Sequence, residues 1–143
     1  MLAASGPRAQ AGPEEFALAV EAAYEGYLLH RGMSRILDAS DRDLALLAGD
    51  RLYALSLAVL ADAGAVEAVR ELADVISLCA LGQAERSPEV EEAAWEAGAT
   101  AIGWGPSEAL EAAKTAARNR VPGSADGLRG AARQVRGDVA HAH

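Results

Sequence analysis

Apolar residues recur along most of this chain at spacings of three and four positions, which is the period of an amphipathic α-helix. The stretch from Asp41 to Ala63 is the richest in leucine, and its apolar residues lie on nearly every side of a helix. A helix that is wet on one side needs only a single apolar stripe. The pattern therefore predicts that this helix is the most enclosed element of the fold, with Leu47, Leu55 and Val59 buried.

Four further helices are predicted, with serine, proline and glycine marking their ends. They cover approximately residues 14–31, 66–82, 88–102 and 107–118. Ser40 is expected to cap the leucine-rich helix, after a loop or short helix over residues 33–39. No segment alternates with the period of a β-strand, so the sequence predicts an all-α bundle of about five helices.

The two ends of the chain are predicted to be less ordered than its middle. Residues 1–13 are small and rich in glycine and proline, and we expect them to be flexible. Residues 14–119 are expected to form one helical domain. Residues 120–143 repeat an amphipathic spacing, but the glycines within it weaken a helix, so this tail is predicted to be marginal or disordered.

Composition adds an expectation about assembly. Of the 143 residues, 51% are hydrophobic but only 4% are aromatic, and alanine dominates the apolar set. Alanine lets helices approach closely but buries little surface per residue. Helix–helix contacts made mainly by alanine therefore bury little surface, and we expect a second chain to help cover the core.

Charge, cysteine content and apolar run length limit the classes of partner and location. The net charge of −8 argues against a nucleic-acid partner. The lone cysteine, Cys79, lies in an apolar run and is interpreted as a buried core residue; without a second thiol it forms no internal disulfide, so a cytoplasmic location is expected. No uninterrupted apolar run reaches about 18 residues, so no membrane span is predicted.

Few residues suggest chemistry. Glu21 and Glu25 are four positions apart, so their carboxylates share a helix face and are candidate Mg²⁺ ligands; a solvated acidic face is the alternative interpretation. The forked guanidinium of Arg31 suits a phosphate, although an arginine also favours a helix end for its charge alone. Asp50 and Arg51 interrupt the apolar helix and, because a buried charge needs a partner, are interpreted as members of a structural ion pair or a helix-end contact, with ligand binding as the alternative.

Three short motifs resemble those of the trans-prenyl diphosphate synthases. Leu47-Ala48-Gly49-Asp50 resembles the LxGDxLL helix of that family, and Gly82-Gln83 resembles the GE or GQ at the end of the helix that follows it. His30-Arg31-Gly32 resembles the RRG that precedes the Gly-Asp pair. The order and separations of the motifs also agree. The resemblance covers about residues 16–85 and implies part of the isoprenoid synthase fold.

The same resemblance implies that catalysis has been lost. The DDxxD motif of the family is replaced by Glu21-Ala22-Ala23-Tyr24-Glu25, in which Ala22 stands where a carboxylate is expected. A second aspartate-rich motif is not found before the chain ends. In the family these motifs hold the Mg²⁺ ions that help diphosphate to leave. The chain is therefore expected to need no cofactor, and to bind Mg²⁺ only if Glu21 and Glu25 form a site.

Three functional hypotheses follow. The first is a non-catalytic prenyl diphosphate synthase-like subunit that pairs with a catalytic prenyltransferase chain in isoprenoid biosynthesis. The second is a small all-α interaction or dimerisation module without isoprenoid chemistry, and the third is an enzyme of another kind that uses Glu21, Glu25 and Arg31 on a phosphorylated ligand. The first two predict a homodimer or heterodimer. The residues predicted on the shared face are Leu46, Tyr53, Leu57 or Leu60.

Overall fold

The computed structural model describes residues 2–9, 12–34 and 40–141 of the chain. Over these residues it contains six α-helices, two short 3-10 turns and no strand. The turns are η1 (Leu2–Ser5) and η2 (Pro7–Ala9), and the helices are α1 (Pro13–His30), α2 (Arg42–Asp62), α3 (Val66–Ala84), α4 (Pro88–Trp104), α5 (Glu108–Arg118) and α6 (Ser124–His141). The all-α prediction is confirmed, with one helix more than the five expected.

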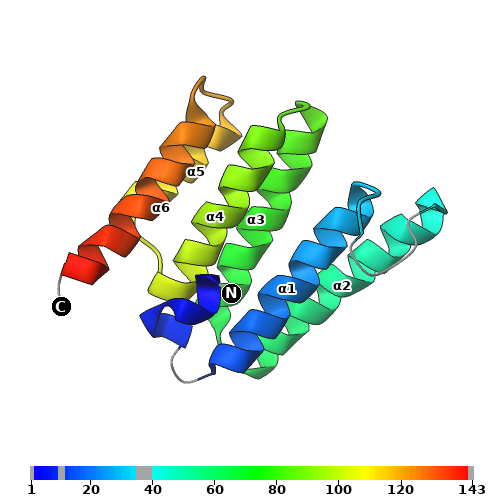
Figure 1. Ribbon diagram of the computed structural model, residues 1–143, viewed down its shortest axis with the longest axis horizontal. Helices are drawn as coiled ribbons and strands as arrows, with labels where there is room; N and C mark the ends of the chain where they lie inside the picture. The colour runs from blue at the N-terminus through cyan, green and yellow to red at the C-terminus, as the bar shows by residue number, and fades with distance from the viewer. Residues whose placement is uncertain (1, 10–11, 35–39, 142–143) are drawn as a thin grey trace.

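Consecutive helices pair as three hairpins, α1–α2, α3–α4 and α5–α6. The connections within α3–α4 and α5–α6 are short, which favours this antiparallel arrangement. Figure 1 shows the α3–α4 hairpin in the middle of the molecule, with α1–α2 on one side and α5–α6 on the other. The leucine-rich helix α2 therefore lies at an outer edge of the fold.

The core centres on α4, so the prediction that the leucine-rich helix is the most enclosed element is wrong. Eleven of the 17 residues of α4 are buried, against four of the 21 in α2. Leu47 is 67% exposed and Leu55 is 44% exposed, while Val59 is half-buried. Of the side chains predicted to lie on a shared face, Leu60 is instead fully buried, and Tyr53 and Leu57 pack against the core.

Small residues explain why α4 can be surrounded. A Cβ atom on Gly98 would lie only 1.9 Å from Cγ2 of Val75 on α3. One on Gly103 would lie 2.5 Å from the carbonyl oxygen of Ala3 in η1. Neighbouring elements thus approach α4 more closely than larger side chains would permit. Apolar residues on all sides of α2 instead mark a helix with an uncovered face.

Both ends of the chain carry structure where they are described. Ala3 in η1 is 1% exposed, and η1 and η2 both contact α4. The tail that was predicted to be marginal or disordered forms α6, which buries Leu128 and Ala132 and packs against α4 and α5. Residues 1, 10–11 and 142–143 of these end segments lie outside the described residues.

Helix caps agree with the sequence at two starts and differ at a third. The hydroxyls of Ser87 and Ser107 accept hydrogen bonds from backbone N–H groups in the first turns of α4 and α5. Helix α2 is capped by Asp41 in place of the predicted Ser40, because the Asp41 carboxylate accepts a 3.1 Å hydrogen bond from the N–H of Leu44. Most of the loop predicted at 33–39 lies outside the described residues.

Alanine substitutions in α2 and α3 check where the core lies. Leu72 of α3 is fully buried, so Leu72→Ala is expected to lower the free energy of unfolding by about 2–5 kcal/mol. Leu55→Ala on the exposed face of α2 is expected to cost only about 0.5 kcal/mol. Urea unfolding at low protein concentration measures both. Equal losses for the two variants would place α2 back in the core.

Candidate functional site

An ion pair joins the end of α1 to the start of α4. Nη1 of Arg31, the residue that follows α1, donates a hydrogen bond to Oε2 of Glu91. Glu91 is 1% exposed, and its hydrogen bond to Arg31 raises the pKa of that guanidinium. Its other oxygen, Oε1, has no hydrogen-bond partner among the described residues. The sequence did not single out Glu91, because an acidic residue in the first turn of a helix is common.

The Gly82-Gln83 motif lies against the same carboxylate. A Cβ atom on Gly82 would lie 2.6 Å from Cγ of Glu91, so only glycine leaves room for this buried side chain. Gln83 lines the cavity beside it. The fold therefore brings Arg31 and the Gly-Gln pair together around Glu91.

The Gly49-Asp50 motif contacts the residue that precedes Arg31. A Cβ atom on Gly49 would lie 2.3 Å from Cδ2 of His30 and 2.8 Å from the carbonyl oxygen of Gly26. Glycine is thus required where α1 and α2 cross. Oδ1 of Asp50 lies 2.9 Å from Nε2 of His30, which agrees with a structural role for this aspartate. The neighbouring Arg51 is exposed and has no ion-pair partner among the described residues, so the prediction of a structural ion pair is wrong for Arg51.

A basic cavity of about 350 Å³ opens where these motifs meet. It is lined by His30, Arg31, Arg42, Gln83, Arg86, Pro88 and Glu91. Arg42 donates a 2.5 Å hydrogen bond to the carbonyl oxygen of His30. Arg86 has a φ of 55°, a left-handed conformation that usually favours glycine at the end of a helix. Three arginines at one cavity of a chain with a net charge of −8 suit an oxyanion, which guanidinium groups bind through paired hydrogen bonds.

Aromatic side chains lie on the other side of Arg31. Tyr24 and Tyr27 of α1 pack on Trp95 of α4 with ring centroids 5.2 and 5.6 Å apart. These rings line a second cavity of about 210 Å³. Burial raises the pKa of Tyr27 to about 12. The phenol therefore stays protonated well into the alkaline range.

The predicted carboxylate pair is not part of this basic cavity. Glu25 is 5% exposed, and its Oε1 accepts a 2.5 Å hydrogen bond from Oγ of Ser34. Glu21 is exposed one turn earlier on α1. Neither residue lines the cavity beside Arg31. The phosphate-binding candidate and the metal-binding candidates are therefore separated.

A cluster of three carboxylates that was not predicted from the sequence lies between α3 and α5. Oxygen atoms of Glu71, Asp74 and Glu111 lie within 4.8 Å of one another. The ammonium of Lys114 occupies this cluster, at 2.8 Å from Glu71 and 2.7 Å from each of the other two. The chain thus supplies its own cation there. Its sequence signal was weak, because acidic and basic residues three positions apart are common on solvated helices.

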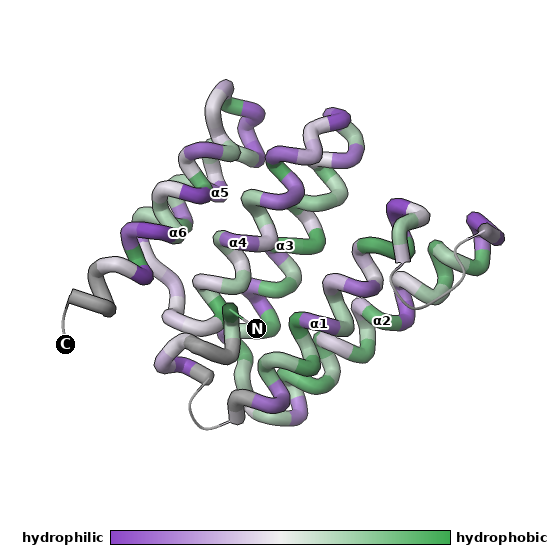
Figure 2. Tube along the Cα trace, in the orientation of Figure 1, coloured by the Kyte–Doolittle hydropathy of each residue, from purple (hydrophilic) through white to green (hydrophobic). Residues whose placement is uncertain are grey.

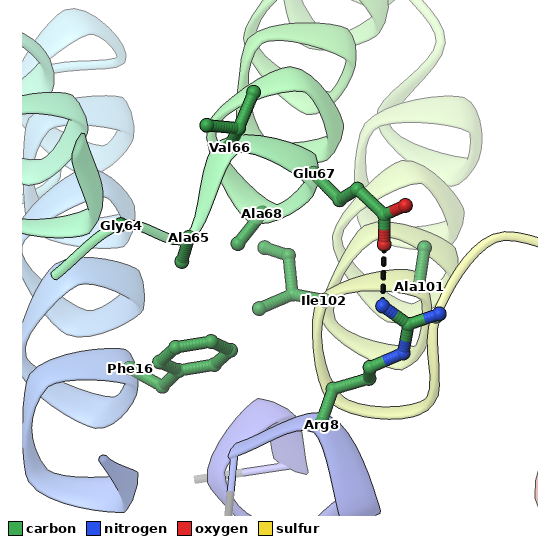
Figure 3. A pocket seen from close by; sticks show the side chains of 10 residues that line it. Arg8, Phe16, Gly64, Ala65, Val66, Glu67, Ala68, Ala101 and Ile102 are labelled. Atoms are coloured by element: carbon green, nitrogen blue, oxygen red, sulfur yellow. Dashed lines mark hydrogen bonds and ion pairs between the residues drawn. The ribbon is translucent and has the colours of Figure 1, made fainter. Parts of the chain in front are cut away.

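A further cavity of about 270 Å³ lies where the N-terminal turns meet α1, α3 and α4. Figure 3 shows Phe16, Ala68 and Ile102 around it, with an ion pair between Arg8 and Glu67 at its edge. The Arg8 Nη1 to Glu67 Oε2 distance is 2.5 Å. The lining is mainly apolar and carries no nucleophile, so this cavity contributes no chemistry.

Comparison with known proteins identifies no relative of this chain. No protein-family model, no curated protein and no solved structure matches it.

Proposed function

We propose that this chain is a non-catalytic subunit that pairs with a catalytic prenyl diphosphate synthase chain. The observation that carries the proposal is the meeting of three motifs at one end of the α1–α2 hairpin. Arg31, Gly82 and Gln83 lie around Glu91, and the adjacent His30 contacts Gly49 and Asp50. Motifs that match only by chance would have no reason to lie together in the fold.

The loss of catalysis is supported by the carboxylates of α1. Ala22 stands where a metal ligand is expected, and Glu25 is already hydrogen-bonded to Ser34. Ionising an allylic diphosphate requires metal charge at the leaving group, and two carboxylates are a poor match for that task. The basic cavity supports contact with phosphate groups but supplies no metal ligands beyond Glu91 and His30.

Co-expression with a catalytic prenyl diphosphate synthase from the same genome tests this proposal. The tagged chain is expected to retain the synthase through purification, and the chain alone is expected to form no product from isopentenyl and allylic diphosphates with Mg²⁺. A tagged helical protein of similar size and charge is the control for non-specific capture. Product formed by the chain alone would refute the loss of catalysis, and failure to retain the synthase would refute the pairing.

An interaction module without isoprenoid chemistry is the second candidate. It is favoured by the exposed leucines of α2, since Leu44 is 60% exposed and Leu47 is 67% exposed. Apolar surface of this kind marks an interaction site more often than an unused face. Retention of a protein unrelated to prenyl transfer, with no retention of the synthase, would favour this candidate.

A further inference from the structure

The outer face of α2 is apolar and uncovered. Figure 2 shows hydrophobic residues along this helix at the edge of the fold, and Leu44, Leu47 and Leu55 are all more than 40% exposed. Among the described residues, α2 is also the one helix that is long and apolar enough to cross a membrane, with 22% of its apolar window buried. This apolar face is therefore a candidate interaction surface.

Exposed residues form one stripe along that face. Leu47, Arg51, Leu55, Ala58 and Asp62 are all exposed and follow one another at spacings of three and four positions. Residues at these spacings lie on the same side of a helix. The stripe combines large apolar, small apolar, positive and negative side chains.

The exposed stripes of two antiparallel copies of α2 are complementary to one another. In an antiparallel pair of helices, a step forward along one copy is a step backward along the other, so facing positions have residue numbers with a constant sum. If position 51 of one α2 lies opposite position 62 of the other, that sum is 113, and position 55 then lies opposite position 58. Arg51 then meets Asp62, and the large Leu55 meets the small Ala58. Two-fold symmetry makes each contact twice, as an interface between identical chains requires.

The two charges distinguish a second copy from a lipid bilayer. Neither Arg51 nor Asp62 has a charged partner within the part of the chain that the structure describes. A bilayer facing the stripe would bury both charges unpaired, which is costly. A second α2 in the antiparallel register gives each charge a partner of opposite sign.

We propose that two copies of this chain pair antiparallel through α2, with Arg51 of each copy bonded to Asp62 of the other. One helix pair buries less than the roughly 800 Å² per partner of a standard interface, so the dimer is expected to be reversible. The Arg31 cavities lie at opposite ends of this dimer. Pairing through α2 thus leaves both cavities open, and it does not depend on the proposed isoprenoid role.

Charge reversal with sedimentation velocity tests the register. Arg51→Asp and Asp62→Arg each bring like charges together and are expected to weaken dimerisation at least about tenfold, by the repulsion that opposed like charges cause. The double variant, Arg51→Asp with Asp62→Arg, restores opposite charges and is expected to recover most of the affinity. Arg133→Asp, at an exposed arginine of α6, is the matched control and should leave the dimer unchanged. Circular dichroism verifies that each variant remains helical.

Several outcomes would overturn the proposal. A wild-type chain that stays monomeric at high concentration would remove it, as would single reversals without effect or a double variant that fails to recover. Binding of the wild-type chain to phosphatidylcholine vesicles with no dimer in solution would assign the stripe to a membrane. Failure to retain a prenyl synthase would refute the proposed function alone, since that experiment does not measure self-association.

Discussion

Replacing Lys114 with methionine is expected to lower the free energy of unfolding by about 3–5 kcal/mol, the usual cost of removing one partner from a buried ion pair. Methionine keeps the apolar length of the side chain but removes its charge. Lys114 and Glu71 are each only 3% exposed, so the substitution leaves a buried carboxylate without its cation. Asp74 and Glu111 lie within 2.7 Å of the same ammonium and would then repel Glu71.

The effect should be large because this cluster joins two elements that share few other contacts. Lys114 lies on α5, whereas Glu71 and Asp74 lie on α3. Burial alone would lower the pKa of Lys114, but the hydrogen bonds that its ammonium donates to three carboxylates outweigh this effect, and the net shift of the pKa is upward. The three carboxylates therefore stabilise the charged ammonium, and the ammonium in turn compensates their negative charges.

Urea unfolding of a small set of variants isolates the stranded charge. Glu111→Gln is the control, because Glu111 is 38% exposed and its loss should cost at most about 1 kcal/mol. A double variant, Lys114→Met with Glu71→Leu, should recover a large part of the loss, since removing both buried partners is far less costly than removing one. A loss below about 1 kcal/mol in Lys114→Met would show that water reaches the cluster.

How far the sequence predicted this fold depends on the kind of signal. Helix periodicity and caps such as Ser87 and Ser107 are local, and they placed the helices well. The ranking of helices by burial failed because it took the number of leucines as a measure of enclosure. Enclosure here comes from small residues such as Gly98 and Gly103, which allow neighbours to approach α4, and that effect depends on which elements are adjacent.

The candidate site was predicted in part for the same reason. Arg31, Gly49 and Gly82 were singled out from their motifs, and the fold gives each a steric or electrostatic role. Glu91, which connects them, had no motif of its own. Its position against Gly82 is set by the α3–α4 hairpin, and only the assembled structure brings it to Arg31.

The fold is expected to lose stability steeply above pH 9. Burial raises the pKa of Cys79 from 9.0 to about 12 and that of Tyr27 from 10.0 to about 12, and it also raises the pKa of Tyr53. The unfolded chain therefore releases these protons at a pH where the folded chain still holds them. Stability falls with rising pH whenever the unfolded state binds fewer protons, by up to about 1.4 kcal/mol per pH unit for each group. The raised pKa of Lys114 acts in the same direction, because its contribution is complete below 10.5 and is lost at higher pH.

Between pH 9 and 10 the cysteine contributes more to this loss than Tyr27 or Tyr53 does. There the Cys79 thiol, with an ordinary pKa of 9.0, ionises further in the unfolded chain than tyrosines with an ordinary pKa of 10.0, which are only half ionised at pH 10. The thiol is expected to contribute about 1 kcal/mol to the loss of the wild-type chain across this interval, so Cys79→Ala should lose about 1 kcal/mol less, even if its stability at pH 7 is lower. Urea unfolding at pH 7, 9, 10 and 11 measures both slopes. Identical slopes for the two chains would mean that the thiol is as accessible to water in the folded state as in the unfolded one, against its 1% exposure in the structure.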